Sequence, residues 1–283
     1  MCGRYAASRS PEDLVELFGV ETWEPAETLA PDWNVAPTKS VYAVLERPLK
    51  DAADRRPVRQ LRALRWGLVP SWAKSPEGAA KMINARAETV HEKPSFRQAF
   101  ESRRCLIPAD GYFEWVTGAA ERELEERGRK KRSRKQPYFV TPVDGSVLAM
   151  AGLYEFWRDP ALPGDHPRAW WVTCSVITTE ASPEPFASGG GSGGGEPEPE
   201  SEPEAGPGSL AEIHPRMPVV LPPERWSAWL DPARRSAEEL LGLLDVPASG
   251  VRAYPVGTAV SDVRNNGPEL VVELAAPEEA TLF

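Results

Sequence analysis

Most of the chain consists of short segments with the composition of β-strands. Runs rich in β-branched and aromatic residues recur between turn residues, a pattern typical of strands. They are SVYAVLE (40–46), QLRALRWGLV (60–69), RRCLIPADGYFEW (103–115), QPYFVTP (136–142), VLAMAGLYEFW (147–157) and AWWVTCSVITT (169–179). Because helical patterns are few and do not alternate regularly with these runs, the sequence predicts an α+β fold rather than an alternating α/β fold.

The helices expected from the sequence are short. Ser10 can cap a first helix that has Pro11 at its first position and ends at Gly19. The other expected helices lie at 93–102, 222–231 and 235–245. The residues of the strand-like segments that we expect in the core include Cys105, Cys174, Trp170 and Trp171.

Two polar stretches interrupt this pattern. Residues 186–209, FASGGGSGGGEPEPESEPEAGPGS, cannot bury enough apolar surface to offset their ordering entropy, so we expect a disordered insertion. The sequence that follows, IHPRMPVVLP, is too short to start a second core. The stretch 117–136 is strongly charged, and a solvated surface segment is favoured over an arm that contacts phosphates. We therefore expect a single domain over residues 1–283.

The net charge of −9 argues against broad electrostatic attraction to nucleic acid. Five glutamates of the 186–209 stretch carry more than half of it, so local basic surfaces remain compatible with the composition. No apolar run approaches the roughly 20 residues of a membrane span, and the N-terminus lacks signal-peptide features, so we expect a cytoplasmic protein. Three cysteines and three histidines without a close ligand pair predict neither a disulfide framework nor a metal site.

The chain begins MCGRYA. If Met1 is removed, Cys2 carries an α-amine with a pKa of about 7.7–8.0 and a thiol with a pKa of about 8.5 on adjacent carbons. The amine can capture an aldehyde as a Schiff base, and the thiol can then close on the imine carbon to give a five-membered thiazolidine. The alternative is a small buried residue at position 2, and the motif alone leaves both open.

Two further polar residues lie within apolar segments. Glu114 stands between Phe113 and Trp115, and strand alternation places both aromatic rings on the opposite face. A carboxyl group beside aromatic rings can have a raised pKa that suits proton transfer, whereas a glutamate facing water is the common alternative. His214, in IHPRMPVVL, could transfer protons near neutral pH or serve as an ordinary structural histidine.

Other segments carry residues that suit binding. INARAET places Asn84, Arg86 and Glu88 at alternate positions, hence on one face if extended. Asparagine can orient a hydroxyl group and arginine can bind a phosphate through two hydrogen bonds. WNVAPT and WGLVPSWAK place Asn34 and tryptophans such as Trp72 near prolines, where the rings could stack against single-stranded bases. A polar strand face and core packing are the respective alternatives.

Seven of these segments, taken in order, resemble the SRAP (SOS response-associated peptidase) family, whose members act on abasic sites in single-stranded DNA. They are MCGRYA, WNVAPT, WGLVPSW, INARAET, RRCLIPADGYFEW, IHPRMPVVL and VSDVRNNGPEL, and they span nearly the whole chain. The resemblance implies a mainly antiparallel, barrel-like core with short flanking helices. It also implies single-stranded DNA containing an abasic site as partner, no cofactor, a monomer, and association with the nucleoid when bound to DNA.

The resemblance also implies roles for individual residues. Cys2 would be the nucleophile that forms a thiazolidine crosslink with the ring-opened sugar and so shields the lesion. Glu114 would assist ring opening and proton transfer, His214 would act as a general acid/base, and Asn84 would orient the sugar and the cysteine. The residues expected to contact DNA are Arg4, Asn34, Trp72, Arg86 and Thr178.

Two departures from the family pattern bear on these roles. Ala73 stands where a second aromatic residue often follows the tryptophan of WGLVPSW, so stacking or the preference for strand junctions would differ. The 186–209 stretch lies between Thr178 and His214, which makes the placement of Thr178 less secure.

Other activities remain open at this point. An N-terminal nucleophile hydrolase of the glutamine amidotransferase type also begins MCG, but the other six segments have no role in it. A non-covalent single-strand binding module would keep the DNA contacts, and retention of Met1 would favour it. Strand cleavage by β-elimination through the Schiff base and self-cleavage of Met1 would be additional activities of the covalent mechanism.

Overall fold

The structure is a computed structural model that describes residues 2–49, 54–117, 135–166, 168–186 and 207–275. The predicted insertion and the predicted charged surface segment lie almost entirely outside these residues, so both stay predictions, as does the single domain over 1–283. Within the described ranges, no helix is both long and apolar enough to cross a membrane.

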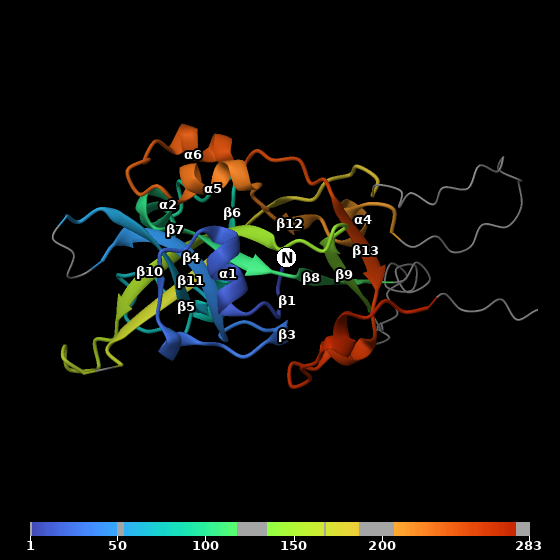
Figure 1. The fold of residues 1–283 in the computed structure, drawn as a ribbon, viewed down its shortest axis with the longest axis horizontal. Helices are drawn as coiled ribbons and strands as arrows, with labels where there is room; N and C mark the ends of the chain where they lie inside the picture. The colour runs from blue at the N-terminus through green and yellow to red at the C-terminus, as the bar shows by residue number, and fades with distance from the viewer. Residues whose placement is uncertain (1, 50–53, 118–134, 167, 187–206, 276–283) are drawn as a thin grey trace, which may run out of the picture.

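The described strands form two sheets (Figure 1). The larger sheet contains, in spatial order, β12 (Arg216–Pro218), β11 (Trp170–Glu180), β10 (Leu148–Arg158), β7 (Arg104–Ala109), β4 (Ser40–Pro48), β5 (Pro57–Trp66) and β2 (Thr22–Trp23), with β6 (Asn84–Arg86) also paired to β11. The smaller sheet contains β13 (Val251–Pro255), β9 (Gln136–Pro142), β8 (Gly111–Val116), β1 (Tyr5–Ala7) and β3 (Asp32–Val35).

The larger sheet closes on itself into a barrel. Strands β5 and β11 pair in parallel, with Arg65 opposite Thr173 and Trp66 opposite Cys174, and this contact joins β5, β4, β7, β10 and β11 in a ring. The other contacts in the ring are antiparallel. The expected α+β fold with a mainly antiparallel, barrel-like core is therefore confirmed.

Both faces of the barrel wall are buried. In β7, Cys105 and Ile107 belong to the cluster inside the barrel, whereas Leu106 between them belongs to a second cluster outside it. The outer cluster also contains Phe18 and Trp229 from helices that cover the wall. This explains why the barrel strands have almost continuous apolar sequences instead of alternating polar and apolar residues.

The helices that cover the barrel are the expected ones, with shorter bounds. They are α1 (Pro11–Phe18), α2 (Arg97–Ser102), α5 (Pro223–Leu230) and α6 (Ala237–Leu244), shown around the barrel in Figure 1. The helix α4 (Leu210–Ile213) and the 3-10 turns η1 (Pro25–Glu27), η2 (Ala79–Lys81), η3 (Thr258–Ser261) and η4 (Pro268–Val271) complete the described helices.

The caps of α1 are those expected. The Ser10 hydroxyl accepts a hydrogen bond from the Asp13 amide over 3.1 Å, and Gly19 ends the helix with a φ of 61°. Arg104 then ties two other helices to the barrel. Its buried guanidinium donates to the Phe100 carbonyl at 2.8 Å and the Trp229 carbonyl at 2.7 Å, at the ends of α2 and α5.

One core prediction is wrong. Trp170 is 56% exposed, because it is the first residue of β11 and pairs with Arg158, the last residue of β10, at the end of the hairpin. Trp171 is half-buried and packs edge-on against Trp157, with ring centroids 5.5 Å apart. Cys105 and Cys174 are fully buried, as expected.

Candidate functional site

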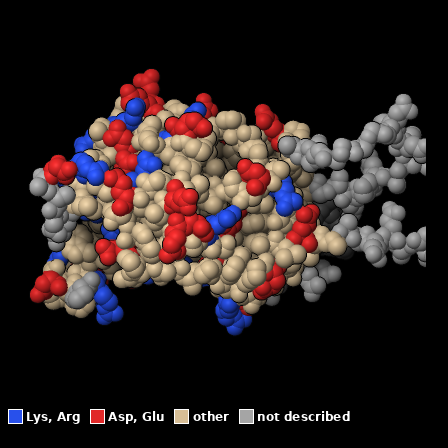
Figure 2. Space-filling view, viewed as in Figure 1, with Lys and Arg blue, Asp and Glu red and all other residues tan. Residues whose placement is uncertain are grey.

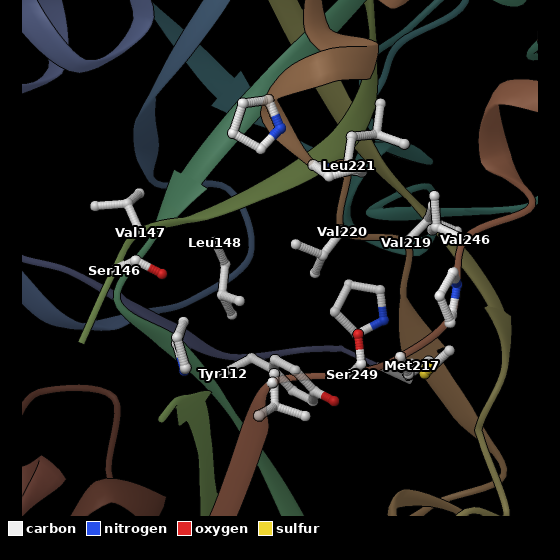
Figure 3. A pocket seen from close by; sticks show the side chains of 18 of the residues that line it. Tyr112, Ser146, Val147, Leu148, Met217, Val219, Val220, Leu221, Val246 and Ser249 are labelled. Carbon is white, nitrogen blue, oxygen red and sulfur yellow. The ribbon is translucent and has the colours of Figure 1, made fainter. Parts of the chain in front are cut away.

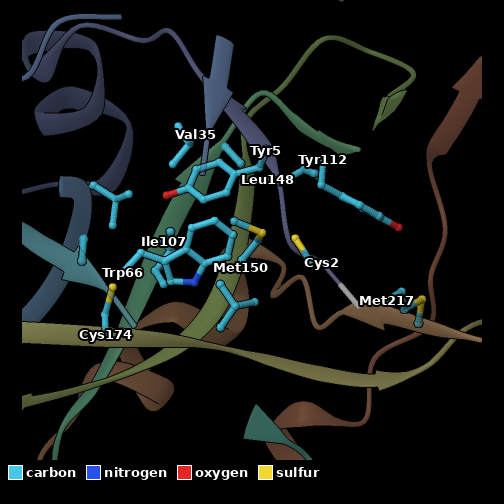
Figure 4. Close-up of a cluster of buried hydrophobic side chains, with 14 of the residues drawn as sticks. Cys2, Tyr5, Val35, Trp66, Ile107, Tyr112, Leu148, Met150, Cys174 and Met217 are labelled. Carbon is cyan, nitrogen blue, oxygen red and sulfur yellow. The ribbon is translucent and has the colours of Figure 1, made fainter. Parts of the chain in front are cut away.

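Cys2 lies three residues before β1 and packs against residues of both sheets. Its side chain is fully buried in the inner cluster, which also contains Tyr112 and Met217 (Figure 4). Burial raises the pKa of the Cys2 thiol well above its ordinary value, and the negative charge of Glu114 raises it further. The thiol is therefore neutral at pH 7 and needs a base before it can react as a thiolate.

The position of Cys2 is fixed by β1, which is paired on both sides, with β3 and β8. The Phe113 amide donates to the Arg4 carbonyl over 2.9 Å, and the Ser8 amide donates to the Asp110 carboxylate over 2.6 Å. Because hydrogen bonds hold this strand at both ends, Cys2, three residues before it, is confined to the same part of the fold.

Asn84 joins Cys2 to the barrel. It begins β6, which runs parallel to β11 with Asn84 opposite Val176. Its side-chain Nδ2 donates to the carbonyl oxygen of Cys2 over 2.8 Å. The Asn84 Oδ1 is buried and accepts no hydrogen bond within the described part of the chain, so it can receive one from a bound molecule.

Glu114 extends from β8 on the face opposite Phe113, as strand alternation predicts. Phe113 packs in a separate cluster on the far side of the smaller sheet, with Trp115 against it. The Glu114 side chain is buried, and this burial raises its pKa to about 7, although the positive charges of the amino terminus and of Lys135 oppose the shift. Both protonation states of Glu114 are therefore populated near neutral pH, as proton transfer requires.

His214 is half-buried at the end of α4. Its Nδ1 accepts a hydrogen bond from the Arg216 amide over 2.9 Å. Partial burial lowers the pKa of His214, and the positive charges of the amino terminus, Arg216 and Lys135 lower it further. The imidazole is therefore mostly neutral at pH 7 and can accept a proton.

Two positive charges, those of the amino terminus and of Lys135, act on several of these residues. The positive charge of the amino terminus lowers the pKa of Cys2, Glu114 and His214, and that of Lys135 lowers the last two. The negative charge of Glu114 acts on Cys2, and α4, which ends at His214, contacts β8, which carries Glu114, so the three residues lie on neighbouring parts of the fold. A thiol, a carboxyl group that titrates near pH 7 and an imidazole can together support nucleophilic attack assisted by proton transfer.

Arg4 and Asn34 are engaged with each other inside the protein. Arg4 Nη1 donates to Asn34 Oδ1 over 2.7 Å and to the Val260 carbonyl over 2.8 Å. Asn34 is fully buried, and its Nδ2 donates to the carbonyls of Asp262 at 3.0 Å and Asn265 at 2.9 Å. These bonds hold the 258–265 segment against β3, so the structure gives Asn34 an internal role, and its contact with DNA stays a prediction.

The other residues expected to contact DNA differ in exposure. Trp72 is 65% exposed on the loop after β5, and Arg86 is exposed at the end of β6. Thr178 is buried opposite Arg86, and its carbonyl accepts a hydrogen bond from Arg216 over 2.6 Å. Trp72 and Arg86 can therefore contact DNA without any rearrangement, whereas the Thr178 side chain is covered.

Comparisons with known proteins identify the family. The model for SOS response associated peptidase (SRAP) matches residues 1–188 and 202–263, which is most of the chain. The chain belongs to the SRAP family. The part between the matched ranges, 189–201, lies within the Gly/Ser- and Glu/Pro-rich stretch, so this SRAP protein carries that stretch in addition to the family core.

Relatives of this SRAP protein come from bacteria and vertebrates. It is 34% identical over 273 residues to the abasic site processing protein YoqW of Bacillus subtilis, covering 96% of this chain and 99% of that protein. It is 29% identical to the abasic site processing protein YedK of Escherichia coli, with coverage of 96% and 99%. With the abasic site processing protein HMCES of Gallus gallus it shares 28% identity, over 99% of this chain and 80% of that protein.

A solved structure shares the SRAP fold seen here. A protein of Bacteroides thetaiotaomicron superposes with a TM-score of 0.68 at 24% sequence identity, over 97% of this chain and 100% of that one. The agreement extends over both sheets, since nearly the whole chain is covered.

A cavity in the described part of the SRAP chain lies beside the candidate site. It has a volume of about 390 Å³ and a largely apolar lining that includes Leu148, Val220 and Ser249 (Figure 3). Tyr112 and Met217 line it and also belong to the buried cluster that contains Cys2. Cys2, Glu114 and His214 do not line it.

Charged side chains are mixed on the face shown in Figure 2, where acidic and basic residues lie side by side. Among the residues that the structure describes, no group of three histidine, cysteine or acidic side chains is arranged to hold a metal ion.

Sequence reasoning missed Arg216, which contacts two of the predicted residues. It donates to His214 through its main chain and to the Thr178 carbonyl through its side chain. The signal that could have found it is its place two residues after His214 in IHPRMP, directly within a motif already singled out.

Proposed function

We propose that this protein processes abasic sites in single-stranded DNA by capturing them covalently at Cys2. The observation that carries the proposal is that Asn84 holds the Cys2 carbonyl at 2.8 Å while the charge of Glu114 acts on the Cys2 thiol. The relatives named above support a role in the processing of abasic sites, since each is named an abasic site processing protein.

The first bond forms after removal of Met1 exposes the α-amine of Cys2. Glu114 promotes opening of the deoxyribose to its aldehyde form, and the Cys2 amine attacks C1′. Neutral His214 takes up the two amine protons in turn and passes both to the sugar oxygen, so that the oxygen leaves as water and a neutral Schiff base results.

The second bond closes the thiazolidine. The Cys2 sulfur adds to the imine carbon, the thiol proton passes to the Glu114 carboxylate, and Glu114 gives this proton to the imine nitrogen, which becomes a secondary amine. Burial that keeps the thiol protonated makes this transfer necessary, and a carboxyl group with a pKa of about 7 can both accept and return the proton. The same groups can run the step backwards, which would release the DNA.

The binding part of the proposal assigns the exposed residues Trp72 and Arg86 to the DNA strand that flanks the lesion. Trp72 would stack on a base and Arg86 would pair with a phosphate. Because the protein recognises the lesion by forming a covalent bond, it needs less electrostatic affinity than a general DNA-binding protein, in keeping with its net charge of −9. We propose that it acts as a monomer in the cytoplasm and associates with the nucleoid through the DNA.

The experiment is a denaturing gel of the protein with a single-stranded oligonucleotide that contains one abasic site. We expect a heat-stable shifted band, absent with an intact-base oligonucleotide and absent in Cys2→Ala. Intact mass spectrometry should give the mass of the Met1-free protein plus the DNA less one water. A Met1-free protein that gives no adduct would contradict the mechanism.

A non-covalent single-strand binding module is the second candidate, and the full burial of Cys2 favours it, because a buried thiol with a raised pKa is a poor nucleophile. In that case Cys2→Ala would bind single-stranded DNA as tightly as the wild type and neither would form an adduct. Release of a cleaved oligonucleotide from the wild type would indicate the β-elimination activity.

A further inference from the structure

An ion pair joins the segment that follows β6 to the segment that contains His214. Arg216 Nη1 lies 2.8 Å from Glu88 Oε1, and Arg216 Nη2 lies 2.9 Å from Glu88 Oε2, so the pair is bidentate. The Arg216 side chain is 14% exposed and that of Glu88 is 43% exposed. A bidentate pair fixes the orientation of the guanidinium as well as its position.

Further hydrogen bonds hold Arg216 in place. Its Nη2 donates to the Thr178 carbonyl of β11 over 2.6 Å. Its main chain pairs with Glu180 in the β11–β12 ladder, and the Ala181 amide donates to the Pro215 carbonyl over 3.0 Å. The side chain and the main chain of Arg216 are thus both held against β11.

The main chain of Arg216 in turn faces the imidazole of His214. Its amide nitrogen is 2.9 Å and its carbonyl oxygen 3.1 Å from His214 Nδ1. In the neutral ring Nδ1 can accept from the amide, which leaves the proton on Nε2. In the charged ring Nδ1–H can donate to the carbonyl. One residue can therefore hold the imidazole in the same place in both protonation states, as a proton-transferring group requires.

We propose that Glu88 is a positioning residue for proton transfer by His214, acting through its ion pair with Arg216. Glu88 also lies four residues after Asn84, so one short segment both holds the Cys2 carbonyl and orients His214. The catalytic part of this inference rests on the proposed function, whereas the effect of Glu88 on the His214 ring does not.

The charges that face His214 set the direction of the expected change. The amino terminus, Arg216 and Lys135 are all positive and lower its pKa. Glu88 is the negative group paired with Arg216, and removal of its charge leaves that arginine uncompensated. We therefore expect Glu88→Gln to lower the pKa of His214 further and to allow the ring to exchange between its two neutral tautomers.

The first test uses the free protein with ¹⁵N-labelled histidine, in which only three imidazoles contribute signals. We expect His214 of the wild type to be protonated on Nε2 in its neutral form, and Glu88→Gln to give averaged shifts and a lower titration midpoint. The matched control is Glu92→Gln, an exposed acid four residues further on, which should leave His214 unchanged. Identical tautomer and titration in Glu88→Gln and wild type would overturn the inference.

The second test measures the rate of adduct formation with abasic single-stranded DNA against pH. Glu88→Gln and Arg216→Lys should each slow it about tenfold at neutral pH, because part of the 10²- to 10⁴-fold typical of acid–base catalysis is lost. The double variant should be no slower than the slower single variant. If Glu88→Gln has the same dependence of rate on pH as the wild type, Glu88 does not assist proton transfer during capture.

A failure of the proposed function can be distinguished from a failure of the inference about Glu88. If the wild type forms no adduct, the proposed function fails while the histidine signals still decide the role of Glu88. Because Glu88 is partly exposed, its variant should keep its melting temperature within about 2 °C. Comparable melting temperatures exclude a general loss of structure as the cause of slower capture.

Discussion

The side-chain amide of Asn84 donates a hydrogen bond to the main-chain carbonyl of Cys2, across 2.8 Å and 82 residues of sequence. Asn84 belongs to β6, which is paired with the barrel, whereas Cys2 precedes β1 of the smaller sheet. One hydrogen bond thus sets the distance between the candidate nucleophile and the barrel.

Loss of this bond should slow capture more than it affects folding. We expect Asn84→Ala to reduce the rate of adduct formation at least tenfold, because the Cys2 main chain loses its fixed position, and to reduce stability by about 1 kcal/mol. Asn84→Asp should behave similarly, since an ionised carboxylate cannot donate. Single-turnover rates measure the expected loss of adduct formation, and urea unfolding measures the expected loss of stability. Full activity in Asn84→Asp would show that donation to Cys2 is not required.

Glu114 should make stability depend on pH. Its pKa is about 7 when folded against about 4.3 in an unfolded chain, so the folded state binds the extra proton between these values. The stability contributed by the protonated carboxyl is complete below about pH 4 and is lost as the pH rises through 7. Glu114→Gln should therefore be more stable than the wild type at pH 8, by up to about 4 kcal/mol, and equal to it near pH 4. Urea unfolding at both pH values measures this, and a difference that does not change with pH would contradict it.

Asn34 should prove essential for stability. Its buried amide satisfies the carbonyls of Asp262 and Asn265 and accepts from Arg4, so Asn34→Ala leaves several buried polar groups without partners. We expect a loss of about 2–4 kcal/mol in the free energy of unfolding and faster amide exchange over 258–265. If the variant is as stable as the wild type but binds DNA poorly, Asn34 acts on DNA after all.

Trp72 should contribute to binding and not to folding. It is 65% exposed, and stacking on one base contributes about 1–3 kcal/mol, so Trp72→Ala should weaken non-covalent binding of single-stranded DNA about 5- to 150-fold. Fluorescence anisotropy at fixed salt, in a Cys2→Ala background, isolates this effect. Trp170→Ala, which removes a tryptophan that is 56% exposed and lies outside the motifs, is the control. Equal losses in both variants would count against a specific stack at Trp72.

Local sequence patterns predicted the elements of this fold because each depends on near neighbours. The Ser10 cap and Gly19 end of α1 follow from residues within a few positions, and so does the alternation around Glu114. The parallel contact between Arg65 and Thr173 that closes the barrel depends on residues 108 positions apart in sequence, and no local pattern specifies it.

In the candidate site, too, some residues could be predicted from their local sequence, whereas the placement of others depends on distant parts of the chain. Cys2, Glu114 and His214 stand out through residue chemistry, and the structure places them on neighbouring elements. The burial of Asn34 could not be foreseen, because it depends on carbonyls more than 200 positions later. The exposure of Trp170 was missed because an aromatic residue at the end of a strand has the same local sequence signature as one in its middle.

Strand β11 contacts β10 and β12 along its antiparallel ladders and β5 and β6 along its parallel ones. The barrel seam, the Asn84 segment and the Arg216 segment therefore share one strand. Separation of β11 from its neighbours would open the barrel and disperse the site in the same event. The amides that pair β6 with β11 should then exchange with solvent as slowly as those of the barrel centre, so that the candidate site is also among the last parts of the fold to open.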